Sequence, residues 1–191
     1  MHDLIPLLEE VRACKLCAAA LPHEPRPVIQ AAQQARILII GQAPGRKVHA
    51  SGIAFDDASG DRLRAWMGID KSTFYDVSKI AIMPMGFCYP GKGRSGDLPP
   101  RPECAPKWHE QILNALPKIE LTLLVGQYAQ KYYLQNQHTS LTENVKNWKD
   151  FLPAFLPMPH PSPRNQLWLK KHSWFEDEVV IYLQSRVAEL V

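Results

Sequence analysis

The sequence predicts an α/β fold with three layers, in which a central, mostly parallel, four-stranded sheet lies between two layers of helices. Short runs of Ile, Leu and Val alternate along the chain with segments whose apolar residues recur at helical spacing. The run at 37–40 is apolar throughout, as expected of a parallel strand buried on both faces. With 191 residues, 46% of them hydrophobic, the chain is long enough for one sizeable core, and we expect a single domain over residues 1–191.

The first half of the chain predicts two helices, a connector and one strand. Apolar positions at helical spacing indicate a helix over 3–12. Three prolines make residues 18–30 an extended connector, and the isoleucine-rich run at 36–41 predicts a strand. After a loop, a helix is expected to begin near Ser59 and to end at Gly68, a residue type that suits a left-handed C-cap.

The second half predicts three more strands and three more helices. The strands are expected at 77–84, 121–125 and 151–158. The helices are expected at about 103–116, at 128–134, and from an N-cap at Ser173 to Leu190. Four glycines and four prolines fill residues 85–102, and a loop of this length inside a compact domain is usually functional.

Charge and hydropathy indicate the cellular location of the protein more clearly than the kind of ligand that it binds. The formal net charge of +3 is weak evidence for a polyanionic ligand, although several basic residues flank the predicted turns. No apolar stretch approaches the roughly 18 residues that span a bilayer, and the N-terminus lacks the plan of a signal peptide. We therefore expect a soluble, cytoplasmic protein with no membrane partner.

The four cysteines suggest a bound metal. Cys14 and Cys17 form a Cys-x-x-Cys pair after a predicted helix, whereas a thioredoxin-type pair would open a helix after a strand. Cys88 and Cys104 flank a loop rich in Pro and Gly, which suits a segment wrapped over a metal centre. Four thiolates could hold a [4Fe–4S] cluster or a structural zinc ion. Unliganded core cysteines are the alternative.

Two polar turns follow predicted strands, at the place where ligands bind in open α/β sheets. Residues 41–45, Gly-Gln-Ala-Pro-Gly, let the backbone approach a ligand closely, and they match neither a P-loop nor the dinucleotide pattern. Residues 160–165, His-Pro-Ser-Pro-Arg-Asn, hold His160 on a stiff turn. His160 is either a hydrogen-bonded packing residue or a functional one, and the polar residues after it favour function.

Taken together, these segments resemble the uracil-DNA glycosylase superfamily. The turn at 41–45 is similar to Gly-Glu-Ala-Pro-Gly, a motif of the family 4, iron–sulfur enzymes, which also carry a Cys-x-x-Cys and two later cysteines at a comparable separation. Residues 52–55 resemble that family's Gly-Arg-Pro-Phe, and residues 124–129 resemble its late strand and helix start. The run at 160–165 is closer to the single-strand-selective and mismatch-specific branches.

The resemblance implies a function, a cofactor and a role for each matched residue. The enzyme would flip a deaminated or damaged nucleotide out of DNA and hydrolyse its N-glycosidic bond, as a monomer in base-excision repair. His160 would stabilise the leaving base, and Gln42 would position the attacking water. The remaining assignments are substrate contacts at Gly41, Ala43, Phe55 and Pro84, DNA contacts at Ser162, Arg164 and Asn165, and a [4Fe–4S] cluster, or alternatively zinc, on Cys14, Cys17, Cys88 and Cys104.

Two departures from the family pattern keep other interpretations open. Gln42 replaces a glutamate and offers no carboxylate as a general base, for which Asp56 or Asp57 could compensate. Pro84 replaces the asparagine that reads the edge of uracil, and proline offers no amide group. The alternatives are a DNA-binding protein of the same fold with little or no uracil excision, and a zinc-stapled hydrolase of small nucleosides.

Overall fold

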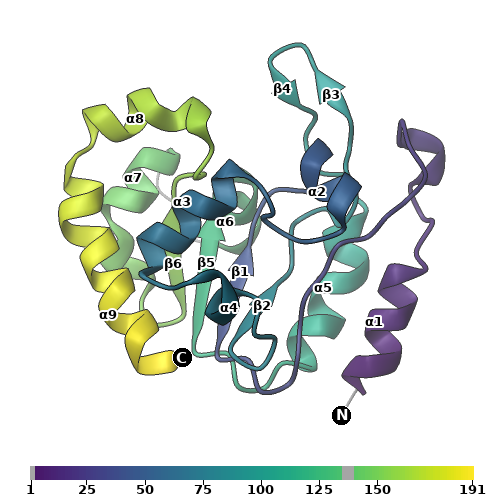
Figure 1. The fold of residues 1–191 in the computed structure, drawn as a ribbon, viewed down its shortest axis with the longest axis horizontal. Helices are drawn as coiled ribbons and strands as arrows, with labels where there is room; N and C mark the ends of the chain where they lie inside the picture. The colour runs from purple at the N-terminus through teal and green to yellow at the C-terminus, as the bar shows by residue number, and fades with distance from the viewer. Residues whose placement is uncertain (1–2, 135–139) are drawn as a thin grey trace.

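The computed structural model describes residues 3–134 and 140–191, and these form a three-layer α/β/α fold (Figure 1). The central sheet has four strands in the order β2-β1-β5-β6, and all neighbouring strands are parallel. The strands are β1 (Ile37–Ile40), β2 (Ile80–Ile82), β5 (Leu121–Val125) and β6 (Phe155–Met158). The predicted fold class and the parallel sheet are therefore confirmed.

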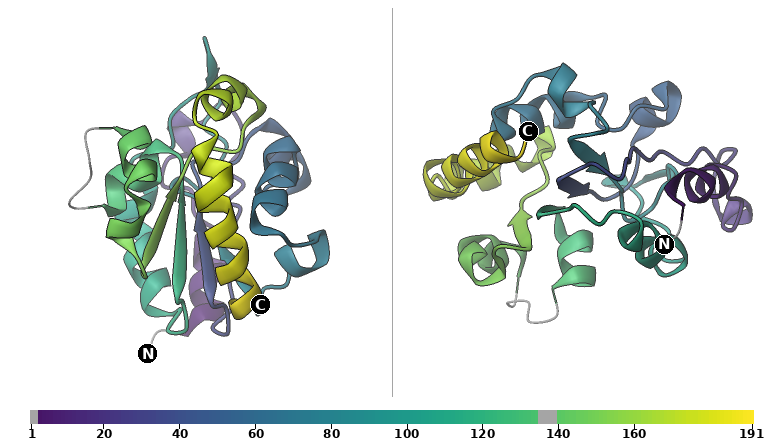
Figure 2. Two further views of the ribbon diagram at one scale, coloured as in Figure 1. Left: turned by 90° about the vertical axis from the view of Figure 1, so that its left-hand side faces the viewer. Right: turned by 90° about the horizontal axis from the view of Figure 1, so that it is seen from below.

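Helices cover both faces of this sheet (Figure 2). On one face, α1 (Leu4–Arg12), α5 (Cys104–Asn114) and α6 (Gln127–Tyr133) pack against the strands. On the other face lie α3 (Ala58–Met67) and the C-terminal helix α9 (Ile181–Leu190). Alternate residues of β1 serve the two cores, because successive side chains of a strand point to opposite faces: Leu38 and Ile40 join the first, Ile37 and Ile39 the second.

Several short elements were not predicted from the sequence. They are the helices α2 (Arg46–Ser51), α4 (Lys71–Phe74), α7 (Leu141–Lys146) and α8 (Gln166–Lys171), and the 3-10 turns Ala18–Ala20, Trp148–Phe151 and Pro163–Asn165. Helices of four to six residues show too few turns for an apolar stripe to stand out. The predicted strands at 77–84 and 151–158 are too long, since only Ile80–Ile82 and Phe155–Met158 pair in the sheet.

The start of the C-terminal helix differs from the prediction. Its first turns form a π-helical segment, Phe175–Val180, whose N-cap is Trp174, and no side chain makes a capping hydrogen bond there. Ser173 instead uses its carbonyl, which accepts from the N–H groups of Glu176 and Asp177. The expected Ser173 side-chain cap is therefore wrong, although the helix itself follows as predicted.

The Pro- and Gly-rich loop contains a small antiparallel hairpin, β3 (Lys92–Gly93) and β4 (Gly96–Asp97). It rises above the carboxyl ends of the sheet strands (Figure 1). The turn 41–45 follows β1, Pro84 follows β2, Gly126 follows β5 and the turn 160–165 follows β6. The parallel sheet thus brings four distant segments to one edge, beneath the hairpin.

Among the described residues, no helix has both the length and the apolar character needed to cross a membrane.

Candidate functional site

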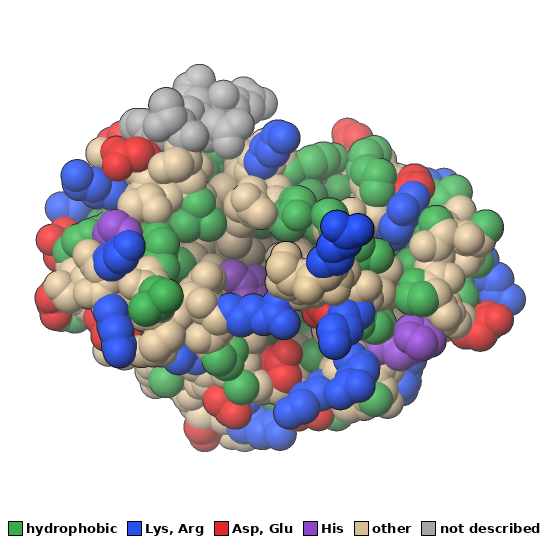
Figure 3. All heavy atoms as spheres, turned by 90° about the horizontal axis from the view of Figure 1, so that it is seen from above, with side chains coloured by type: hydrophobic (Ala, Val, Ile, Leu, Met, Phe, Trp, Pro, Cys, Tyr) green, Lys and Arg blue, Asp and Glu red, His purple; other side chains and the backbone are tan. Residues whose placement is uncertain are grey.

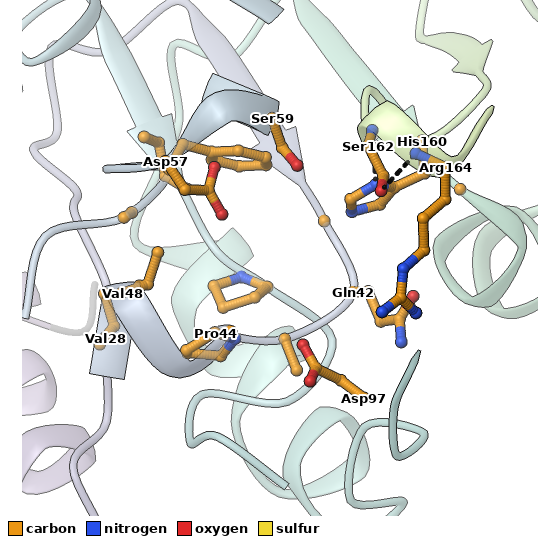
Figure 4. A pocket seen from close by; sticks show the side chains of 18 of the residues that line it. Val28, Gln42, Pro44, Val48, Asp57, Ser59, Asp97, His160, Ser162 and Arg164 are labelled. Carbon is orange, nitrogen blue, oxygen red and sulfur yellow. Dashed lines mark hydrogen bonds between the residues drawn. The ribbon is translucent and has the colours of Figure 1, made fainter. Parts of the chain in front are cut away.

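A pocket of about 510 Å³ opens at this edge of the sheet. Its lining includes every residue that the sequence analysis assigned to catalysis, substrate or DNA: Gly41, Gln42, Ala43, Phe55, Pro84, His160, Ser162, Arg164 and Asn165. Figure 4 shows Gln42, Arg164 and His160 on one side of the cavity and Asp57 with Ser59 on another. Seen from the hairpin side, Lys and Arg side chains gather around a hollow near the middle of this face (Figure 3).

The turn 41–45 forms the floor of the pocket. Its first two carbonyls accept hydrogen bonds from the segment that follows β2: Met85 N–H donates to Gly41 O (2.9 Å), and Gly86 N–H donates to Gln42 O (3.0 Å). A Cβ at Gly41 would lie 3.1 Å from Cζ of Phe55, so glycine at this position lets the aromatic ring rest on the backbone. The Gln42 side chain faces the cavity (Figure 4).

Phe55 adopts a backbone conformation that few non-glycine residues take, with φ at +54°. Gly60 permits it, because a Cβ at that position would overlap the Phe55 carbonyl. The Phe55 ring meets Phe74 edge-on, with 6.1 Å between ring centroids. Asp57, two residues later, caps α3 by accepting from Gly60 N–H (3.0 Å). Local structure therefore fixes the ring at the pocket wall.

His160 is held as a neutral ring. Its Nδ1 accepts the backbone N–H of Ser162 (3.2 Å), so in the neutral ring the proton sits on Nε2. Burial lowers the pKa of His160, although the carboxylates of Asp57 and Asp97 act in the opposite direction. Asn165 Nδ2 donates to the His160 carbonyl (2.7 Å) and braces the turn. The geometry can present an N–H donor to a ligand in the pocket.

Ser162 and Arg164 tie the His160 turn to neighbouring elements. Ser162 Oγ accepts from the N–H of Arg164 (3.2 Å), and the Ser162 carbonyl accepts from Arg62 (3.2 Å). Arg164 reaches across to the hairpin, where Nη1 donates to the Ser95 carbonyl (2.8 Å) and the guanidinium packs against Gly96. Arg164 thus links the turn after β6 to the hairpin that overhangs the pocket.

Pro84 is anchored by a histidine that the sequence analysis missed. His109 Nε2 donates to the Pro84 carbonyl (3.1 Å), and its Nδ1 accepts from the Tyr133 hydroxyl (2.6 Å). Because His109 is almost completely buried, desolvation lowers its pKa to about 4. Its place on α5 gives no sequence signal, since it lies between Trp108 and Glu110, 25 positions along the chain from Pro84.

Three further polar residues line the pocket without having been predicted as site residues: Ser59, Asp97 and Gln127. Of the two aspartates considered as substitutes for the missing glutamate, Asp57 lines the pocket. Asp56 is absent from the lining and pairs with Lys71 (3.4 Å). Asp97 comes from the hairpin, which no periodicity in the sequence indicated.

The four cysteines are free thiols, and three of them, Cys17, Cys88 and Cys104, are buried. They lie in one neighbourhood: Cys104 and Cys14 both act on the pKa of Cys17, and Cys17 and Cys14 act on the pKa of Cys88. Burial raises the pKa of Cys88 to about 11 and that of Cys104 to about 12. Within residues 3–134 and 140–191, no group of three or more His, Cys, Asp or Glu side chains could hold a metal ion.

The fold and the pocket define an α/β protein with a ligand site at the carboxyl edge of its sheet. Residues 29–184 match the family model described as the uracil DNA glycosylase superfamily. The chain belongs to this superfamily. It is also 28% identical, over 156 residues, to the type-4 uracil-DNA glycosylase of Sulfurisphaera tokodaii. That alignment covers 76% of this chain and 64% of the other protein, so the match spans less than two thirds of the relative.

Proposed function

We propose that the protein is a DNA glycosylase that removes a deaminated or damaged base by hydrolysis of the N-glycosidic bond. The observation that carries the proposal is the neutral His160, whose Nδ1 accepts a backbone N–H and whose Nε2 therefore carries the proton, in a pocket that Phe55 also lines. Superfamily membership and the similarity to a type-4 uracil-DNA glycosylase support the same conclusion. The substrate would be uracil or a related base.

In this proposal the flipped base stacks against Phe55 at the pocket wall. Cleavage leaves the bonding electron pair on the departing base, and negative charge develops on its carbonyl oxygen. A donor that is already fixed and neutral stabilises that charge without reorganisation, which is the role of His160 Nε2–H. Gln42 faces the same cavity and would orient the attacking water with its amide group.

DNA would bind across the face that surrounds the pocket. Ser162, Arg164 and Asn165 line its mouth, and basic side chains gather around the hollow (Figure 3). Arg164 uses Nη1 to bind the Ser95 carbonyl, whereas a guanidinium carries five N–H donors. The remaining donors would be available to phosphate oxygens. We propose that the protein acts on DNA as a monomer.

The cysteines would hold a [4Fe–4S] cluster. Cys14, Cys17 and Cys88 all act on the pKa of Cys104, so the four thiols share one neighbourhood, and four thiolates there could bind such a cluster or, alternatively, a structural zinc ion. The backbone of Arg26 lowers the pKa of Cys88 and that of Phe87 lowers the pKa of Cys104, so both backbone segments favour the thiolates that would bind the iron. When bound, the cluster would tie the N-terminal segment to the 88–104 loop.

The function is tested by incubating the protein with single- and double-stranded oligonucleotides that each carry one uracil, hypoxanthine or xanthine. Base release, detected as alkali-sensitive strand cleavage, is the expected result. Salt-dependent binding to DNA without release would favour a DNA-binding protein that has lost catalysis. Release from free nucleosides but not from DNA would favour the small-nucleoside hydrolase.

A further inference from the structure

The pocket contains carboxylates that have no role in the reaction described above. Attack of water on C1′ of the sugar releases a proton, and a positioned carboxylate is a common acceptor for it. The turn 41–45 offers only the amide of Gln42, which cannot accept a proton at neutral pH. Among the described residues, the pocket lining includes two carboxylates, Asp57 and Asp97.

Asp57 is already used by the fold. Its Oδ1 accepts from Gly60 N–H (3.0 Å) and caps the first turn of α3, which keeps that oxygen on the helix terminus. It lies with Ser59 on the side of the cavity away from Asp97 (Figure 4). Asp57 is therefore well placed to support the local structure but faces the turn 41–45 less directly.

Asp97 lies against that turn. Its Oδ2 is 3.4 Å from the point where a Cβ at Gly45 would stand, which is ordinary van der Waals contact. Its Oδ1 accepts from the Tyr89 hydroxyl (3.4 Å), so the carboxylate is oriented by a hydrogen bond. Figure 4 shows this carboxylate beside Pro44, on the same side of the cavity as the Gln42 amide.

The hairpin that carries Asp97 is held to the catalytic side of the pocket. Arg164 Nη1 donates to the carbonyl of Ser95 (2.8 Å), which lies in the turn of the hairpin just before the strand of Asp97. At the base of the hairpin, Leu98 N–H donates to the Gly91 carbonyl (2.8 Å). Because Arg164 belongs to the same turn as His160, the hairpin and that turn are positioned together.

We propose that Asp97 is the general base of this enzyme and replaces the carboxylate that the motif at 41–45 lacks. The inference rests on the proposed function. As the water oxygen bonds to C1′, its proton moves to Asp97 Oδ2, and the C1′–N bond breaks with its electron pair leaving on the base. Gln42 holds the water between C1′ and Asp97 Oδ2, and His160 Nε2–H stabilises the departing base. The proton is finally returned to the released base through solvent.

The test is single-turnover release from oligonucleotides that carry uracil, hypoxanthine or xanthine. Asp97→Asn keeps the size of the side chain and an oxygen that can accept from Tyr89, but it removes the proton acceptor. Loss of a general base should slow release by about 10²–10⁴-fold. Affinity for the same oligonucleotide should be unchanged or tighter, because a negative charge has been removed from a DNA-binding face.

Two matched variants control this comparison. Asp177→Asn removes an exposed carboxylate outside the pocket, on the C-terminal helical segment, and should release base at the wild-type rate. Asp57→Asn tests the competing carboxylate, and thermal unfolding of each variant shows that it folds.

The outcomes distinguish a failure of the Asp97 assignment from a failure of the proposed glycosylase function. A folded Asp97→Asn variant that releases base as fast as wild type overturns the assignment of Asp97 and leaves the glycosylase proposal intact. Loss of rate in Asp57→Asn but not in Asp97→Asn assigns the role to Asp57 and likewise overturns it. A wild-type protein that releases none of these bases overturns the proposed function and, with it, the role of Asp97.

Discussion

The backbone N–H of Ser162 donates a hydrogen bond to Nδ1 of His160 over 3.2 Å. An imidazolium has an N–H at both nitrogens and cannot accept this bond, so the contact selects the neutral ring. Burial acts in the same direction, because it lowers the pKa of His160. The hydrogen bond between Ser162 and His160, two residues apart in the sequence, thus favours the neutral state of His160, on which the proposed chemistry depends.

Gly60→Ala should destabilise the protein and displace Phe55. The added Cβ would overlap the Phe55 carbonyl, and overpacking of this kind costs about 1–3 kcal/mol of the free energy of unfolding. Denaturant unfolding measures the cost, with Ser59→Ala as the neighbouring control. Equal stability of the two variants would mean that the backbone at 55 moves freely and is not fixed by Gly60.

The sheet and the position of the pocket could be predicted because strand burial leaves a direct mark in the sequence. The run 37–40 is uniformly apolar, and its glycine- and proline-containing turn marks the carboxyl end of the strand. The same holds for the run that ends at His160. Once the strands are parallel, these turns must meet at one edge.

The remaining parts of the site depend on tertiary contacts that leave no periodic signal. The hairpin strands are two residues long, so nothing in the sequence separated Asp97 from the rest of a Pro- and Gly-rich loop. His109 reaches Pro84 from a helix 25 positions later in the chain. Neither the place of Asp97 at the pocket nor the contact between His109 and Pro84 follows from local spacing, because both depend on the tertiary fold.

Stability should fall in mild acid because of His109. Its pKa is about 4 in the folded protein against an ordinary value of 6.5, so below pH 6.5 the unfolded chain takes up a proton that the folded protein does not. The stabilisation is present above pH 6.5 and is lost as the pH falls through about 4. The difference in pKa corresponds to ~3 kcal/mol.

The measurement is the free energy of unfolding between pH 7 and pH 4 for wild type and His109→Gln. The variant has no titrating group at this position, so its stability should fall by less over the same range. Parallel curves for the two proteins would contradict the buried, neutral His109.

Cys17→Ser should lower both metal content and thermal stability, because the free energy of metal binding is also free energy of folding. Iron analysis, absorption near ~400 nm and the melting temperature measure the effect. Ala19→Ser, an exposed change in the same segment, is the control. If Cys17→Ser matches that control in iron and in melting temperature, the cysteines are ordinary core residues.

Pro84→Asn should raise excision of uracil relative to hypoxanthine. Proline offers no side-chain amide, and a site without such a contact discriminates poorly between bases. The ratio of the two single-turnover rates measures the change, and Pro99→Asn, an exposed proline of the same loop, is the control. An unchanged ratio in a folded variant would place the base-reading contact on another residue of the pocket.

The most direct test of the account is single-turnover base release by wild type and His160→Ala on the same lesion-bearing oligonucleotides. We predict that wild type releases at least one of uracil, hypoxanthine and xanthine. Loss of the His160 donor should slow that release by roughly 10²–10³-fold, while DNA affinity stays close to that of wild type. Equal rates in the two proteins, or no release by wild type from any of these substrates, would contradict the account.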